Sequence, residues 1–231
     1  RSDRFLVGWA AGMLLLATGV ILYSVLPPDN MAIAATAFTM EIIGFVIVFV
    51  AARQFAGRTT SFFHVALLLL TAVPVGLPIA LGFDGFGIMI YNFLAGGFLA
   101  ASAGHYWTTR SEAPSSMALL CLLYVLAALS FFACGAVLLQ QAEWIMGRRP
   151  DNWAEQLNAI MCIIGITGVG ALSLGLNHAR AARRHRLEAR TDILSGLLNR
   201  RALFDTMTAQ DLEPGHAVVA FDLDDFKAIN D

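Results

Sequence analysis

Three aspartates near the C-terminal end of the sequence directly follow an apolar run. The run Ala-Val-Val-Ala-Phe, residues 217–221, has the composition of a buried strand, and Asp222-Leu-Asp-Asp follows it. A carboxylate at the end of a buried strand is costly unless a cation or a helix N-terminus meets it. We therefore expect Asp222 to be a metal ligand, and Asp224 or Asp225 to cap the next helix. Capping alone would explain Asp224 or Asp225, but less easily Asp222.

Two segments of this tail resemble the opening of the GGDEF domain, the catalytic domain of diguanylate cyclases. Residues 191–201, Thr-Asp-Ile-Leu-Ser-Gly-Leu-Leu-Asn-Arg-Arg, look like the family's Thr-Asp-x-Leu-Thr-Gly-Leu-x-Asn-Arg-Arg motif. Residues 221–231, Phe-Asp-Leu-Asp-Asp-Phe-Lys-Ala-Ile-Asn-Asp, resemble its first strand and the following helix. The two motifs stand in the family's order and at its usual spacing.

The resemblance implies an enzyme that converts two GTP into cyclic di-GMP and two pyrophosphates. It works as a homodimer in which each subunit holds one GTP. By resemblance, the Asp222 carboxylate and the Leu223 carbonyl bind Mg²⁺ (or Mn²⁺), and the main chain around Asp225 and Phe226 approaches the phosphates. Asn230 would form hydrogen bonds with the guanine edge.

The Gly-Gly-Asp/Glu-Glu-Phe signature of that family is not among the 231 residues. We therefore expect this stretch by itself to be inactive, and the activity to belong to the full-length protein. The alternative is a non-catalytic, degenerate GGDEF domain that serves as a nucleotide receptor or a membrane scaffold. A transporter or channel is a third hypothesis.

The rest of the sequence must hold this tail at a membrane. Hydrophobic residues make up 58% and charged residues 14% of the chain, which excludes a disordered chain and a soluble enzyme spanning the whole length. Of the 32 charged residues, 17 lie in the last 54 positions. We predict an all-α six-helix transmembrane bundle over residues 1–177, a signalling-helix linker over 178–191, and the start of an α/β GGDEF (nucleotidyl-cyclase-like) domain over 192–231.

Six apolar windows are long enough to cross a bilayer as helices. They cover residues 5–26, 31–51, 61–81, 86–107, 117–139 and 157–177.

The distribution of arginines predicts the orientation of these spans. One side of the membrane would carry ten of them: Arg1, Arg4, Arg53, Arg58, Arg110, Arg180, Arg183, Arg184, Arg186 and Arg190. The other side would carry only Arg148 and Arg149. We expect both termini to be cytoplasmic, in a bacterial inner membrane. Lipid, GTP and a second copy are the expected partners, together with an unidentified ligand of the membrane domain; nucleic acid is not expected.

Three polar residues inside the spans are candidates for sensing. Glu41 lies in the middle of the second span, where a carboxylate is costly unless it is paired, protonated or facing a wet cavity. It is either a ligand or proton sensor, or a structural group hydrogen-bonded across the bundle to Asn92 or Tyr91. His64 and His105 could together hold a haem or a metal ion, although we favour a packing role for both.

Local signals predict further details. Pro74 and Pro78 predict a kink in the third span. Asn199 is suited to cap a helix over residues 200–208, and the sixth span is expected to continue as helix beyond the membrane. The three cysteines lie in apolar stretches and are interpreted as small hydrophobic residues.

Overall fold

The computed structural model describes residues 2–25, 30–192, 195–208 and 219. Within these residues the chain is helical, with no strand, and it divides into two compact units, Arg1–His178 and Ala179–Asp231. The α/β domain predicted for the second unit, including its strand over residues 217–221, falls mostly outside the described residues.

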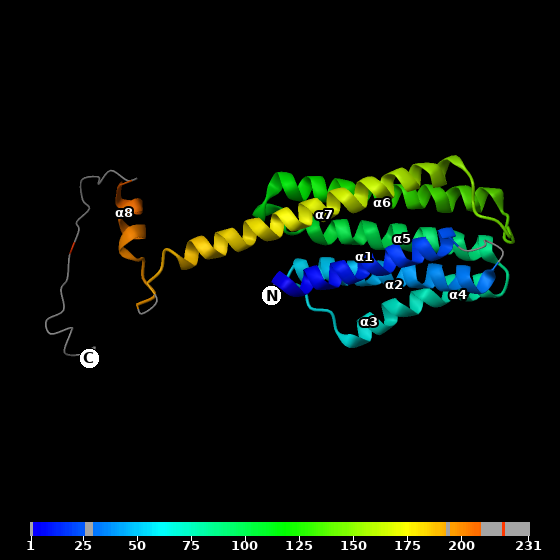
Figure 1. Ribbon diagram of the computed structural model, residues 1–231, viewed down its shortest axis with the longest axis horizontal. Helices are drawn as coiled ribbons and strands as arrows, with labels where there is room; N and C mark the ends of the chain where they lie inside the picture. Colours follow the sequence, from blue (N-terminus) through cyan, green and yellow to red (C-terminus); the bar gives the residue numbers. More distant parts are fainter. Residues whose placement is uncertain (1, 26–29, 193–194, 209–218, 220–231) are drawn as a thin grey trace. The chain divides into compact units, whose positions relative to one another are not determined.

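The helices follow one another along the chain, and Figure 1 labels the α-helices among them. They are α1 (Ser2–Val25), α2 (Met31–Phe55), α3 (Phe62–Leu69), η1 (Leu70–Ala72), α4 (Val73–Ala80), α5 (Asp84–Trp107), η2 (Arg110–Glu112), α6 (Pro114–Gln141), α7 (Trp153–Glu188) and α8 (Arg200–Thr208).

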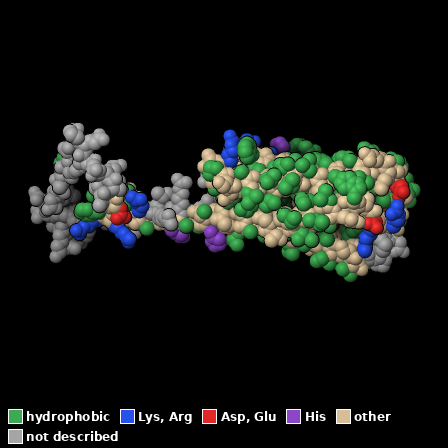
Figure 2. Space-filling view, turned by 90° about the horizontal axis from the view of Figure 1, so that it is seen from above, with side chains coloured by type: hydrophobic (Ala, Val, Ile, Leu, Met, Phe, Trp, Pro, Cys, Tyr) green, Lys and Arg blue, Asp and Glu red, His purple; other side chains and the backbone are tan. Residues whose placement is uncertain are grey.

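Six helical stretches of the first unit are long and apolar enough to cross a membrane, as the sequence predicted. This is a membrane protein. On the face seen in Figure 2, hydrophobic side chains cover the length of the bundle, and charged side chains gather at its ends. The sixth span begins at Trp153, earlier than predicted, because Asn152 Oδ1 accepts hydrogen bonds from the backbone N–H groups of Ala154 and Glu155 at 3.0 and 3.2 Å.

The third span is broken where the prolines predicted a kink. α3 ends at Leu69, a single 3₁₀ turn follows, and α4 begins at Val73 with Pro74 in its first turn. Proline has no backbone N–H to donate, so the α-helical hydrogen-bond ladder is interrupted here. An interruption next to Pro74 is confirmed, whereas Pro78 lies inside α4 without ending it.

Glycines allow α1 and α2 to pack with their backbones close together. A Cβ on Gly12 would lie 3.0 Å from the Gly44 carbonyl oxygen, and one on Gly44 would lie 3.0 Å from the Gly12 carbonyl oxygen. A Cβ on Gly19 would lie 2.5 Å from Glu41 Cγ. Small residues let membrane helices approach one another closely. The crossing therefore depends on the absence of side chains at these positions.

The connection between α6 and α7 closes one end of the bundle. Both carboxylate oxygens of Asp84, in the first turn of α5, accept backbone hydrogen bonds at 2.8 Å, from Met146 and Gly147. Arg149 Nη2 lies 2.8 Å from the carbonyl oxygens of Tyr23 and Ser24 at the end of α1. This connection therefore links α1 and α5 through polar contacts at the membrane surface.

Substituting Gly19 by alanine should weaken the α1–α2 crossing. The new methyl group would overlap Glu41 Cγ and force the helices apart, so we expect the free energy of unfolding to fall by about 1–3 kcal/mol. The measurement is unfolding in mixed detergent micelles. Gly97→Ala is the matched control, because nothing lies within 4 Å of a Cβ there; equal effects of the two variants would contradict the close crossing.

Removing the Asp84 carboxylate should release the α6–α7 connection. Asp84→Ala leaves two backbone N–H groups without their charged acceptor, and we expect it to cost about 2–4 kcal/mol of stability in the same assay. Glu143→Ala is the control, because its ion pair with Arg148 is largely exposed and should be worth under about 0.5 kcal/mol. A loss for Asp84→Ala no larger than that of the control would contradict this account.

Candidate functional site

Glu41 of α2 and Tyr91 of α5 meet inside the bundle. The Tyr91 hydroxyl donates a hydrogen bond to Oε2 of Glu41, and both residues are buried. The predicted hydrogen bond across the bundle is confirmed, and its donor is Tyr91 rather than Asn92. The Asn92 amide instead donates to the Ile88 carbonyl of its own helix at 3.0 Å. The hydrogen bond reduces the cost of burying a carboxyl group in an apolar interior.

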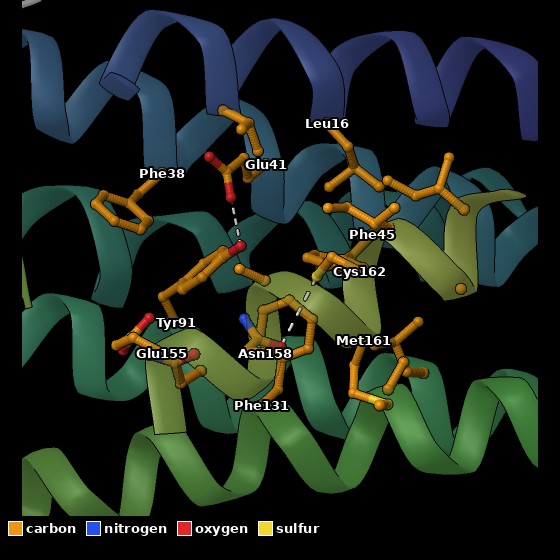
Figure 3. Close-up of a pocket in the computed structure, with 18 of the residues that line it drawn as sticks. Leu16, Phe38, Glu41, Phe45, Tyr91, Phe131, Glu155, Asn158, Met161 and Cys162 are labelled. Carbon is orange, nitrogen blue, oxygen red and sulfur yellow. Dashed lines mark hydrogen bonds between the residues drawn. The ribbon is translucent and has the colours of Figure 1, made fainter. Parts of the chain in front are cut away.

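Aromatic rings hold Tyr91 in place. The ring centroids of Phe38, Phe45 and Phe131 lie 4.8, 6.3 and 6.0 Å from that of Tyr91, in T-shaped or tilted arrangements. Such edge-to-face contacts are favourable for aromatic pairs. The phenol is therefore fixed by α2 and α6, with its hydroxyl directed at Glu41 (Figure 3).

A cavity of about 490 Å³ lies beside this pair, within the size range of small-molecule sites. Its walls come from α1, α2, α5, α6 and α7, and most of the side chains that line it are apolar. Figure 3 shows that side chains from separate helices converge on it. The sequence reasoning that singled out Glu41 did not predict the cavity.

The α7 wall of the cavity carries its own polar groups. Ser130 Oγ of α6 lies 2.8 Å from Asn158 Oδ1, which is also 3.8 Å from the Cys162 Sγ of its own helix. Glu155 and Asn158 both line the cavity and were not recognised in the sequence. Glu155, Asn158 and Cys162 stand three and four positions apart, so they share one helix face. That spacing is a usable signal, but the predicted sixth span begins at residue 157 and leaves out Glu155.

The cysteines behave as the sequence predicted. Cys121 and Cys134 are buried, Cys162 is partly buried, and all three are free thiols. Cys121 Sγ also lies 3.4 Å from the Ala103 carbonyl oxygen and Cys162 Sγ 3.8 Å from Asn158 Oδ1, contacts that a weakly polar thiol can make in an apolar interior.

The two candidate histidines have separate environments. His64 is exposed, and its Nδ1 lies 2.5 Å from Oγ of Ser61, the residue that caps α3. His105 is partly buried, with its ring centroid 5.4 Å from that of Phe49. Within the part of the chain that the structure describes, no group of three or more His, Cys, Asp or Glu residues could hold a metal ion. Joint binding of a haem by these histidines stays a prediction.

Asp192 and Asn199 hold the turn that precedes α8. Asp192 Oδ1 accepts a hydrogen bond from the backbone N–H of Ser195 at 2.8 Å, and Asn199 Nδ2 donates to the Ala189 carbonyl at 2.7 Å. Asn199 Oδ1 accepts from the backbone N–H of Ala202 at 3.0 Å, so the predicted cap of α8 is confirmed. α7 continues to Glu188, past the apolar span that ends at Leu176.

The nucleotide and metal positions expected from the resemblance lie outside the described residues. They are Asp222, Leu223, Asp225, Phe226 and Asn230. Their roles stay predictions.

No protein-family model, curated protein or solved structure matches this chain. Its function is therefore argued from its residues and their geometry.

A double-mutant cycle on Glu41 and Tyr91 should measure their hydrogen bond. Glu41→Leu and Tyr91→Phe should each lower the free energy of unfolding, and the double variant should lose about 1–2 kcal/mol less than the sum of the two. The measurement is unfolding in mixed micelles. The control cycle combines Glu41→Leu with Ser102→Ala, because Ser102 is buried in the same helix as Tyr91 and its hydroxyl donates to the Phe98 carbonyl of that helix. Additive effects of Glu41→Leu and Tyr91→Phe would contradict the pairing.

Proposed function

We propose that this protein is a membrane-bound, signal-transducing diguanylate cyclase. It would join two GTP molecules into cyclic di-GMP and release two pyrophosphates, working as a homodimer. The observation that carries the proposal is the pair of motifs at residues 191–201 and 221–231, which resemble the GGDEF opening in residue types, order and spacing.

The structure around the first motif supports the proposal. The first motif begins three residues after the end of α7, and its Asp192 and Asn199 hold a hydrogen-bonded turn that leads into α8. Both side chains thus stabilise the chain just before α8, inside the first motif. A helix that runs from a membrane span to this turn provides a covalent path by which a change in the bundle could reach the enzyme domain.

The charge distribution supports a cytoplasmic location of the tail. Six spans place the two ends of the bundle sequence on the same side of the membrane. Ten arginines, counted up to Arg190, would lie on that side, against two on the other. We therefore place both termini in the cytoplasm, at the inner membrane of a bacterium, where GTP is available.

The residues of the second motif would bind the substrate. The Asp222 carboxylate and the Leu223 carbonyl are oxygen donors of the kind that Mg²⁺ prefers, and the ion would offset negative charge on the transferring phosphate. The main chain at Asp225 and Phe226 would approach the phosphates, and the Asn230 amide would select guanine. Each subunit would hold one GTP, so that the 3′-hydroxyl of one attacks the α-phosphate of the other.

The test is cyclic di-GMP formation by a chain that carries the complete domain, reconstituted in nanodiscs with GTP and Mg²⁺. We expect turnover, and Asp222→Ala should lower it by at least about 100-fold, because a lost metal ligand costs several kcal/mol of transition-state stabilisation. The product is measured by chromatography.

Asp211→Ala is the matched control, since this acid lies in the same tail but outside both motifs. Its turnover should equal that of the unchanged protein. GTP binding without any product would contradict the proposal, and would favour a non-catalytic nucleotide receptor or membrane scaffold.

A further inference from the structure

The cavity beside Glu41 opens towards the bilayer. Val20 of α1 and Ile163 and Ile166 of α7 line it, and each of these side chains is more than half exposed. Exposed apolar side chains in the middle of a membrane-spanning bundle face lipid. A molecule dissolved in the bilayer can therefore enter between α1 and α7 without crossing water.

Contacts at both ends of α1 and α7 border this opening. At one end, Arg149, which precedes α7, lies 2.8 Å from the carbonyl oxygens of Tyr23 and Ser24. Towards the other end, a Cβ on Gly170 of α7 would be 3.5 Å from the Trp9 ring of α1. The gap therefore lies between the Arg149 contact at one end and the close approach of Gly170 to Trp9 towards the other.

The described lining of the cavity contains carboxyl groups but no cationic side chain. Glu41 Oε2 accepts from Tyr91, and within the described part of the chain no donor or cation pairs with Glu41 Oε1. The described lining contains the acids Glu41 and Glu155 but no Lys, Arg or His. Asn158 adds an amide on the α7 wall.

These groups select a narrow class of ligand. An anionic amphiphile would meet two acids in a low-dielectric site, and a cation would have to leave water to reach it through lipid. A neutral hydroxyl both donates and accepts, so it can pair with the Glu41 carboxyl in either protonation state. The apolar walls and the volume of about 490 Å³ suit a long hydrocarbon body.

We propose that this cavity binds a neutral, lipid-soluble alcohol, with its hydroxyl at Glu41 and its apolar body between α1 and α7. Such a ligand would contact the span that continues towards the C-terminal unit, so its binding would stabilise one packing of α7. The site does not depend on the proposed cyclase activity, and the 231-residue chain itself can test it.

The experiment is photolabelling of the chain in zwitterionic nanodiscs with a hexadecanol that carries a mid-chain diazirine. Labelled peptides are identified by mass spectrometry. We expect saturable labelling concentrated on residues 16–20 of α1 and 161–166 of α7, compared with residues 62–69 of α3, none of which lines the cavity beside Glu41. Non-saturable labelling, spread equally over these segments, would show bilayer partition alone and overturn the proposal.

Competition on the unchanged chain tests the head group. Unlabelled hexadecanol should displace the probe at least about tenfold better than its methyl ether, which cannot donate a hydrogen bond to Glu41. It should also displace the probe better than hexadecylamine. Equal competition by the ether, or stronger competition by the amine, would overturn the assignment to a neutral alcohol.

Variants locate the site independently. Glu41→Leu should abolish the difference between alcohol and ether while the probe still binds. Ala127→Phe should lower labelling several-fold, because Ala127 lines the cavity and the ring would fill it. Leu129→Phe is the matched control, since Leu129 is on the same helix and exposed, away from the cavity lining. Persistence of the alcohol preference in Glu41→Leu would overturn the role of this carboxyl.

Discussion

Hydrocarbon offers a polypeptide no hydrogen-bond partners, and this constraint shapes the first 178 residues of the protein. Each span must satisfy its own backbone, so the described bundle is helical throughout and its one broken span is bridged by a 3₁₀ turn. Polar side chains inside it must also find partners. Tyr91 donates to Glu41, Ser130 lies against Asn158, and Asp84 accepts backbone hydrogen bonds near the surface.

Packing within the bundle is uneven. α2, α5 and α6 form the interior, and 61% of the second span's apolar window is buried, against 17% for the sixth. The sixth span is therefore held by few interior contacts and borders the cavity with one face. Elements with little buried area are those whose packing changes at least cost. The helix that continues beyond the membrane is thus among the most easily shifted of the spans.

This arrangement relates the two proposals. A ligand between α1 and α7 would bury apolar surface on two of the spans with little buried area. α7 continues to Glu188, shortly before the turn held by Asp192 and Asn199. Ligand binding in the cavity would then raise the population of the α7 position that binds the ligand more tightly. The cyclase proposal rests on residue motifs, and the ligand proposal rests on geometry, so either can fail without the other.

The sequence by itself determined the features that depend on neighbours along the chain. The length of the apolar stretches determines the six spans. The missing N–H of proline determines the break after Leu69, and the Asn199 side chain determines where α8 begins. The hypothesis of a cyclase rests on the residue types of the motifs at residues 191–201 and 221–231.

Only the tertiary structure decided which groups meet across the bundle. Tyr91 and Asn92 are consecutive and both were possible partners of Glu41, but they point about 100° apart around α5, so helix packing selected Tyr91. Asp84 binds backbone groups 62 and 63 positions away, and the cavity takes its walls from five helices. Such contacts depend on the rotation and spacing of whole helices, which local sequence patterns do not specify.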